Sequence, residues 1–289
     1  MSLSETTTRV IVAAVGIPVA IAVVYLGGWA LGALLAAIAV LATLEFYRLA
    51  EAKGVKALAG LGALIAALFV VVGAMDPAQG PEVPGFAVLF VLAALVIPAA
   101  AIWARGITGQ PVLTVGVTLI GAVYAGALLS FGLFLRHLPG IASDLHGTVV
   151  LFAPVALTWA SDTCAYFVGR RWGTRKLIPS VSPGKTVQGA VGALIGTTVA
   201  AVGYGQLLSH FPTYRLDPLE AIAFGLLISV AAQVGDLAES LFKRDAGVKD
   251  SGVLLPGHGG ALDRFDSLLF TLPLGYFFFR YVIGVLPAS

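Results

Sequence analysis

Charged residues and cysteine are scarce in this sequence. Of its 289 residues only 11% are charged, whereas 58% are hydrophobic. A typical soluble domain has about 25% charged residues, so a water-soluble globular fold is excluded because the chain lacks polar surface to cover such a core. The hydrophobicity also excludes disorder, and the continuous apolar runs lack the alternation of a membrane β-barrel. The remaining class is an all-α, polytopic helical membrane protein.

Several kinds of site are excluded as well. The single cysteine, Cys164, allows neither an intramolecular disulfide nor a multi-cysteine metal site. No Gly-x-Ser-x-Gly elbow for a serine nucleophile occurs. A net charge of +2 is too small to indicate nucleic-acid binding. Four scattered histidines lack the spacing of a zinc site: His137, His146, His210 and His258.

Long uncharged runs predict about nine membrane spans of roughly 20 residues each. No charge occurs from Val10 to Leu44, which is long enough for two spans that break near Gly27-Gly28. We interpret the N-terminal run as the first span rather than as a signal peptide, because it continues directly into the second. The other spans are predicted at about 57–75, 84–104, 112–135, 148–168, 187–208, 219–241 and 267–286.

The basic residues sort by side in this arrangement. Fourteen of the 17 Lys and Arg residues lie on the N-terminal side, and the exceptions are Arg136, Arg215 and Arg280. The positive-inside rule therefore predicts a cytoplasmic N-terminus and cytoplasmic loops at about 170–186 and 240–266. The composition, rich in Ala and Gly, favours a bacterial inner membrane. The small-residue pairs Gly28/Gly32 and Gly192/Gly196 predict close helix packing and permit a homodimer.

Carboxylates occur inside two of the predicted spans. Asp162 lies in the sixth span, and Asp236 and Glu239 lie in the eighth. A carboxylate in hydrocarbon costs at least about 2.5–3.5 kcal/mol, so it normally faces a cavity, an ion or a partner. Asp162 and Asp236 each precede the cytoplasmic end of their span by seven residues, or about 10 Å of helix. Both are therefore expected at similar depth; the alternative is an ion pair with Arg that only supports packing.

The first cytoplasmic loop has the composition of a phosphate site. It contains five cations, and a helix is expected to begin near Thr186, beside Ser182 and Lys185. Lys, Arg and helix N-termini favour phosphate, although anionic lipid headgroups would attract the same cations. Gly184-Lys185-Thr186 is not a P-loop, because Pro179 stands where the motif requires glycine.

The second cytoplasmic loop is denser in charge. Between residues 240 and 266 it contains four basic residues, four Asp, His258 and the glycines Gly259 and Gly260. Carboxylate and phosphate oxygens are the ligands that Mg²⁺ prefers, and cations beside a bound metal fit a polyphosphate substrate. The alternative is a solvated charge cluster.

At these residues the sequence resembles the phosphatidate cytidylyltransferase (CDP-diacylglycerol synthase) family. The resemblance is specific from about 157 to 266, and Ala261 departs from the larger aliphatic residue usual in the family. Ser161-Asp162 through Gly169-Arg170 and Ser182-Pro183-Gly184-Lys185-Thr186 are also similar to it. The main signature is Ser240-x-Phe242-Lys243-Arg244, Lys249-Asp250-x-Gly252 and Leu255-Pro256-x-His258-Gly259-Gly260-x-x-Asp263-Arg264-Phe265-Asp266.

The resemblance implies the reaction CTP + phosphatidate → CDP-diacylglycerol + diphosphate at the cytoplasmic membrane face. It implies Mg²⁺ bound by Asp236 and Asp263, and the family admits a second, monovalent cation. By resemblance, Lys243, Arg244, Lys249 and Arg264 neutralise phosphate, and His258 either donates to the diphosphate or orders the turn. The other expected substrate contacts or supporting residues are Ser182, Lys185, Asp162, Asp250 and Asp266.

The positions of these residues predict two parts of the chain with different roles. Residues 1–147 are predicted to be scaffold and lipid-facing helices, and residues 148–289 to carry the site. Three other functions stay open: a CTP-dependent polyprenol kinase, a cation-coupled transporter with carboxylate sites, and a lipid-binding scaffold. A CDP-alcohol phosphotransferase is excluded because its Asp-Gly-x-x-Ala-Arg run does not occur.

Overall fold

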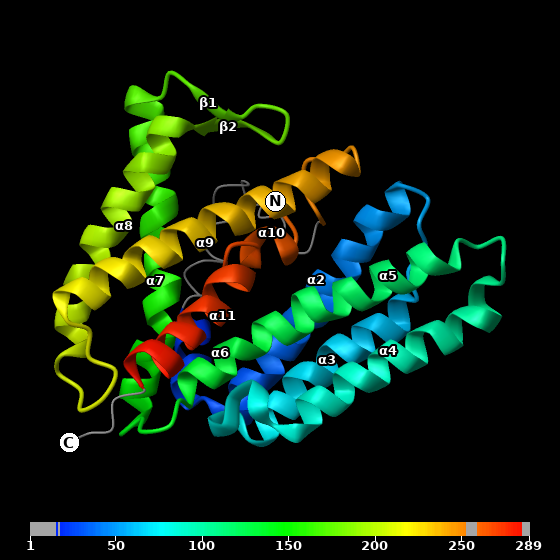
Figure 1. Cartoon of the computed structure of the whole chain (residues 1–289), viewed down its shortest axis with the longest axis horizontal. Coiled ribbons are helices and arrows are strands. Elements are labelled where there is room, and N and C mark those ends of the chain that lie inside the picture. The colour runs from blue at the N-terminus through cyan, green and yellow to red at the C-terminus, as the bar shows by residue number, and fades with distance from the viewer. Residues whose placement is uncertain (1–15, 17, 253–258, 285–289) are drawn as a thin grey trace, which may run out of the picture. The chain divides into compact units, whose positions relative to one another are not determined.

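The computed structural model describes residues 16, 18–252 and 259–284 and is helical along most of them (Figure 1). The long helices contain the apolar runs, and several extend beyond them into charged residues, as α9 does at Lys243–Asp245. The elements are α2 (Gly28–Ala52), α3 (Ala59–Met75), η1 (Pro77–Glu82), α4 (Pro84–Arg105), α5 (Pro111–Ala122), η2 (Val123–Ala127), α6 (Leu128–Arg136), α7 (Asp144–Trp172), β1 (Lys176–Ile178), β2 (Ser182–Thr186), α8 (Val187–Leu208), α9 (Pro218–Asp245), α10 (Leu262–Phe265), α11 (Leu268–Phe277) and η3 (Phe278–Ile283).

Within the described residues, six helices are long and apolar enough to cross a membrane. A seventh, α3, is apolar but shorter. These seven match the second to eighth predicted spans and confirm an all-α integral membrane protein. The first predicted span falls partly outside the described residues, and the last consists of α11 followed by the π-helical turn η3. The count of nine spans and the orientation stay predictions.

The chain forms two compact units, and the first contains residues 1–134 and 242–265. Its helices α2, α3, α4 and α5 pack against one another (Figure 1). Small residues bring them close, since a Cβ on Gly126 would stand 2.5 Å from the backbone of Ala66. Phe69 and Phe134 are fully buried in this unit. The signature segment 242–265 therefore belongs to the same compact unit as the N-terminal helices.

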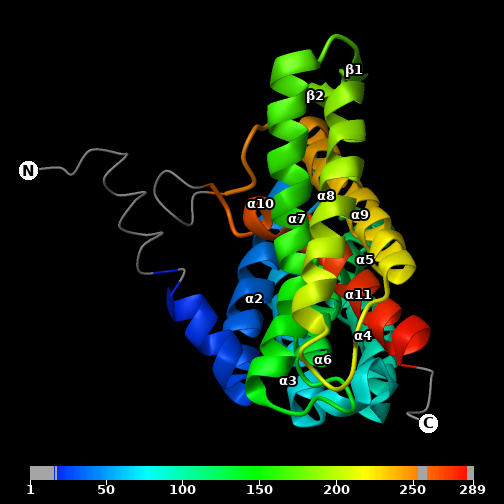
Figure 2. The same ribbon diagram turned by 90° about the vertical axis from the view of Figure 1, so that its left-hand side faces the viewer.

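The second unit contains residues 135–241 and 266–289. In it α7 and α8 run side by side, and the hairpin β1–β2 lies at one end of the pair (Figure 2). Buried hydroxyls link the helices: Thr158 of α7 donates to Thr271 of α11 at 3.1 Å. Ser161 of α7 and Ser229 of α9 share a hydrogen bond of 3.2 Å. Such polar contacts fix the rotation of helices in an apolar environment, where packing alone discriminates weakly.

The pair Gly192/Gly196 packs against another helix of the same chain. A Cβ on Gly192 would stand 2.6 Å from the Val168 side chain of α7, and one on Gly196 would overlap Cys164. This confirms the predicted close packing and assigns it to the α7–α8 contact. In the other pair, Gly32 packs against α3, whereas a Cβ on Gly28 would meet nothing within 4 Å among the described residues, so close packing at Gly28 stays a prediction. A homodimer stays a prediction.

Candidate active site

The hairpin fixes Lys185 beside the start of α8. Strands β1 and β2 are antiparallel, with Lys176 opposite Thr186. The Thr186 hydroxyl accepts a hydrogen bond from the Gly189 amide at 3.1 Å and so caps α8. Thr186 also packs against the end of α7, where a Cβ on Gly173 would stand 2.7 Å from its side chain. The helix start predicted near Thr186 is confirmed, and the capped residue holds its neighbour Lys185 in place.

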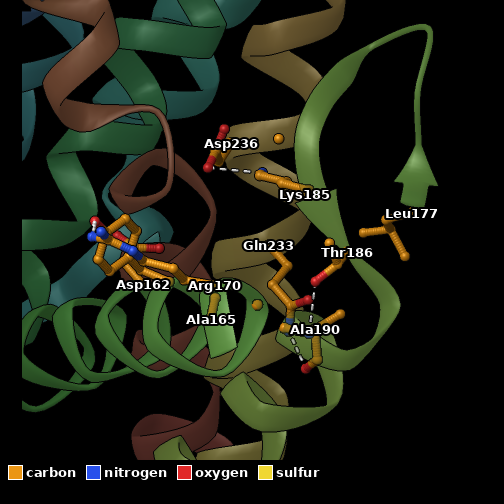
Figure 3. Close-up of a pocket in the computed structure, with 13 residues that line it drawn as sticks. Asp162, Ala165, Arg170, Leu177, Lys185, Thr186, Ala190, Gln233 and Asp236 are labelled. Carbon is orange, nitrogen blue, oxygen red and sulfur yellow. Dashed lines mark hydrogen bonds and ion pairs between the residues drawn. The ribbon is translucent and has the colours of Figure 1, made fainter. Parts of the chain in front are cut away.

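Lys185 points toward Asp236 beside a cavity of about 450 Å³ (Figure 3). Its ammonium lies 2.7 Å from Asp236 Oδ2, and the two side chains are 26% and 34% exposed. The cavity is lined from α7, the hairpin, α8 and α9, and about half of its lining residues are small or apolar. Its polar residues include Asp162, Arg170, Lys185, Thr186, Gln233 and Asp236. The cavity therefore combines apolar walls with charges of both signs.

A third carboxylate, Asp266, lies near Asp162 and Asp236. The backbone of Asp266 lies against Gly235, where an added Cβ would stand 2.8 Å from the Asp266 carbonyl oxygen. Asp266 precedes α11 in a turn outside the long helices. Burial raises the pKa of its carboxyl to about 7, and the negative charges of Asp236 and Asp162 add to the effect. The described electrostatic neighbours of Asp266 are thus carboxylates, and its predicted role as a supporting residue stays a prediction.

Arg170 faces the same cavity from the last turn of α7. Its guanidinium donates to the Tyr166 hydroxyl at 2.7 Å and lies 5.9 Å from the centre of that ring. Gln233 donates to Ser229 Oγ at 3.3 Å and reaches the Ala190 carbonyl at 3.4 Å. Arg170 and Lys185 give the cavity two cations from different elements, which suits an anionic ligand.

Asp263 lies at the centre of a hydrogen-bond cluster in the first unit. Its Oδ1 accepts from the Lys243 ammonium at 2.7 Å, and its side chain is 9% exposed. Its Oδ2 accepts from the Ser251 amide at 3.0 Å, the Ser251 hydroxyl at 2.9 Å and the Gly260 amide at 2.8 Å. Four donors thus orient this carboxylate, and two residues of the signature, Lys243 and Asp263, lie in direct contact.

The other predicted site residues have fewer described contacts. Arg244 donates to the Val248 carbonyl at 3.2 Å. Ser182 lies at the opposite end of β2 from Thr186. Lys249, Asp250 and Arg264 are exposed. His258 lies outside the described residues.

The donor set offers oxygen ligands suited to Mg²⁺. Asp236 fits best, because it borders the cavity and its Oδ1 has only the Ser240 hydroxyl at 3.3 Å as a described neighbour. Asp263 offers Oδ1, where the Lys243 ammonium now supplies the positive charge. Among the described residues, no group of three or more His, Cys, Asp or Glu has metal-binding geometry. Water and phosphate oxygens would have to complete the coordination, as is usual for Mg²⁺.

Comparison with known proteins shows which family matches nearly the whole chain. A model of the cytidylyltransferase family matches residues 7–282. A phosphatidate cytidylyltransferase of Synechocystis is 32% identical over 307 aligned positions, covering 97% of this chain and 98% of that protein. The chain belongs to the cytidylyltransferase family. The match therefore includes every helix around the cavity.

Two further relatives match over a shorter stretch. A phosphatidate cytidylyltransferase of Bacillus subtilis is 41% identical over 163 residues, or 56% of this chain and 57% of that protein. The uncharacterized Escherichia coli protein YnbB is 43% identical over 168 residues, or 58% and 54%. The matched stretches thus span about half the length of these two relatives, so membership of the family is shown and the activity is inferred.

One buried residue of this family member escaped the sequence analysis. Glu45 lies in α2, is 3% exposed, and contacts the signature segment. The available signal was an ionisable residue between Leu44 and Phe46, directly after the longest uncharged run. No role was predicted for Glu45 because the N-terminal helices were predicted to be scaffold alone. Arg170 was noticed in its loop, but only the fold shows that it faces the cavity.

Proposed function

We propose that this chain is a phosphatidate cytidylyltransferase that converts CTP and phosphatidate to CDP-diacylglycerol and diphosphate. The observation that carries the proposal is the match to the Synechocystis enzyme along almost all of both chains. The cavity supports it, because a lipid with a phosphate headgroup needs both apolar walls and cations. Family membership also favours cytidylyl transfer over the polyprenol kinase and the transporter.

In this reaction an oxygen of the lipid phosphate attacks the α-phosphorus of CTP. A new P–O bond forms, the bond to the bridging oxygen breaks, and diphosphate leaves with that electron pair. The attacking phosphate is already ionised at neutral pH, since its second pKa is about 6. The protein therefore needs no general base, and its tasks are to neutralise charge and to align the reactants.

The residues of the second unit suit the binding of a phosphate. Lys185 and Arg170 present positive charge to the cavity from the hairpin and from α7. The capped start of α8 holds Lys185 in place, so little reorganisation is needed when an anion binds. Asp236 keeps the Lys185 ammonium ordered in the absence of substrate. We propose that Lys185 contacts a substrate phosphate.

The residues of the first unit suit the same chemistry. Lys243 is held at 2.7 Å by Asp263, and Arg244, Lys249 and Arg264 add exposed cations. We propose that these cations neutralise phosphate oxygens and that Asp236 and Asp263 bind Mg²⁺. When bound, Mg²⁺ would withdraw charge from the phosphate oxygens. His258 and Asp250 keep the supporting roles predicted for them.

The membrane context completes the proposal. Phosphatidate enters from the bilayer and CTP from solution, so a site near the membrane surface serves both substrates. We propose that the protein lies in a bacterial inner membrane with this site facing the cytoplasm, where CTP is made. The excess of Lys and Arg in the loops 170–186 and 240–266 supports that orientation.

The test is cytidylyl transfer by the purified full chain in detergent with CTP, phosphatidate and Mg²⁺. The wild type is expected to form lipid-bound cytidine and to release diphosphate. The Asp236→Asn and Asp263→Asn variants are each expected to react at least about 100-fold more slowly than the wild type. This is the typical effect of losing a group that stabilises charge in the transition state. The matched control is Asp76→Asn, because Asp76 contacts only the exposed Gln79 in the described hydrogen bonds. A folded wild type without product would refute the function, and active Asp variants would refute only the metal assignment.

A further inference from the structure

Glu45 of α2 holds the backbone of the signature segment. Its Oε1 accepts a hydrogen bond from the Ala261 amide at 3.0 Å. Its Oε2 accepts from the Leu262 amide at 2.7 Å and from the Ser251 hydroxyl at 3.1 Å. Both carboxylate oxygens are thus used by residues more than 200 positions away in the sequence.

Two glycines let the segment approach this carboxylate. A Cβ on Gly252 or on Gly260 would overlap the Glu45 side chain. A Cβ on Gly260 would also stand 2.5 Å from Ser251 Oγ. The backbone at Gly252 and at Gly260 therefore lies directly against Glu45, which requires glycine at these two places.

Ser251 joins Glu45 to the predicted site. Its hydroxyl lies 3.1 Å from Glu45 Oε2 and 2.9 Å from Asp263 Oδ2. Asp263 in turn holds Lys243. A continuous chain of contacts therefore runs from α2 through Ser251 and Asp263 to Lys243, and all of it lies within one compact unit.

We propose that Glu45 is a positioning residue that sets the orientation of Asp263 and Lys243. A buried carboxylate is costly, so a merely space-filling role at this place would be better served by an apolar side chain. Other contacts from α2 act beside it: Phe46 packs edge-to-face on Phe242 at 5.5 Å, and Lys53 lies 3.3 Å from Asp245. Those contacts hold residues 242–245 at the end of α9, whereas only Glu45 among them binds the start of α10, which carries Asp263.

The first test compares Glu45→Gln with Glu51→Gln. Glu51 lies in the same helix but is exposed, so it is the matched control. The Glu45→Gln variant turns an amide group toward at least one donor from which the carboxylate accepted a hydrogen bond. Because this inference rests on the proposed function for its kinetic readout, wild-type activity is measured alongside. We expect Glu45→Gln to lower kcat at least tenfold and to raise the half-saturating Mg²⁺ concentration about fivefold, since Asp263 is displaced.

The shift in Mg²⁺ dependence separates positioning from poor folding. A smaller folded fraction lowers kcat and leaves the half-saturating Mg²⁺ concentration unchanged. An unchanged kcat, or a lowered kcat without that shift, would overturn the proposal. A double-mutant cycle with Ser251→Ala adds a check: the two changes act on one chain of contacts, so the double variant should lose far less than the product of the single losses.

Hydrogen exchange gives a readout that does not depend on activity. The amides of Ala261 and Leu262 are expected to exchange at least tenfold faster in Glu45→Gln, and peptides from α3 at the wild-type rate. If Glu45→Gln does not fold, Ser251→Ala takes its place, with faster exchange at Gly260 and a kcat at least fivefold lower expected. Wild-type exchange in a folded variant would overturn the inference. An inactive wild type with the expected exchange would refute the proposed function and leave intact the role of Glu45 in holding the start of α10.

Discussion

Replacing Lys185 by Met removes the cation that the hairpin presents to the cavity. The ammonium lies 2.7 Å from Asp236 and is 26% exposed, so it is partly shielded from water and held ready for an anion. A hydrogen bond to a charged group contributes about 1.5–3 kcal/mol. At about 1.4 kcal/mol for each tenfold in rate, kcat/KM is expected to fall roughly 10- to 150-fold.

The effect on Mg²⁺ should be opposite to the effect on substrate. Lys185 neutralises part of the charge of Asp236, the carboxylate that we propose as a metal ligand. Removing the ammonium leaves Asp236 more attractive to a divalent cation. Lys185→Met is therefore expected to keep or lower the half-saturating Mg²⁺ concentration while it raises KM for CTP or for phosphatidate.

The assay is initial-rate cytidylyl transfer with Mg²⁺ and each substrate varied in turn. Lys53→Met is the matched control, because Lys53 also pairs with an aspartate, Asp245, at 3.3 Å, with side chains 50% and 66% exposed. An exposed pair of this kind contributes about 0–1 kcal/mol, so the control should stay within about fivefold of the wild type. A folded Lys185→Met protein with wild-type kcat/KM would refute the role of Lys185.

Three further outcomes are expected. Gly192→Ala should lower the melting temperature of the protein in detergent by several degrees, because the new Cβ would meet Val168 at 2.6 Å. Gly203→Ala in the same helix has open space and should not lower the melting temperature. Equal melting temperatures of the two variants would contradict the packing. EDTA should abolish cytidylyl transfer and added Mg²⁺ should restore it, and activity that persists in EDTA would remove the metal assignment. Asp162→Asn should raise the half-saturating Mg²⁺ concentration about threefold by removing one negative charge near Asp236, and an unchanged or lowered value would contradict this electrostatic role.

The helical membrane fold was predictable because each span carries its own signal. An uncharged run of about 20 residues needs no partner in the sequence to be recognised, and the bounds of α8 match the prediction of 187–208. The start of α8 was equally local, since Thr186 caps the helix next to it. The resemblance implied roles for Lys243 and Asp263, and the structure adds that the two side chains are paired at 2.7 Å.

Contacts between distant segments were not predictable in the same way. Glu45 and Ser251 meet across 206 positions, and no periodicity in either segment encodes that meeting. The hairpin β1–β2 was missed because its strands have three and five residues, one of them rich in Pro and Gly, which is poor strand composition.

The most direct test of the central claim determines which phosphate of CTP is transferred to the lipid. The purified chain is given phosphatidate, a polyprenol, Mg²⁺ and CTP labelled either at the α-phosphate or at the γ-phosphate. The account predicts that the α-label enters the lipid together with cytidine, while the γ-label leaves as diphosphate. Transfer of the γ-label to a lipid alcohol, with no cytidine in the lipid, would contradict the account and identify a CTP-dependent kinase instead.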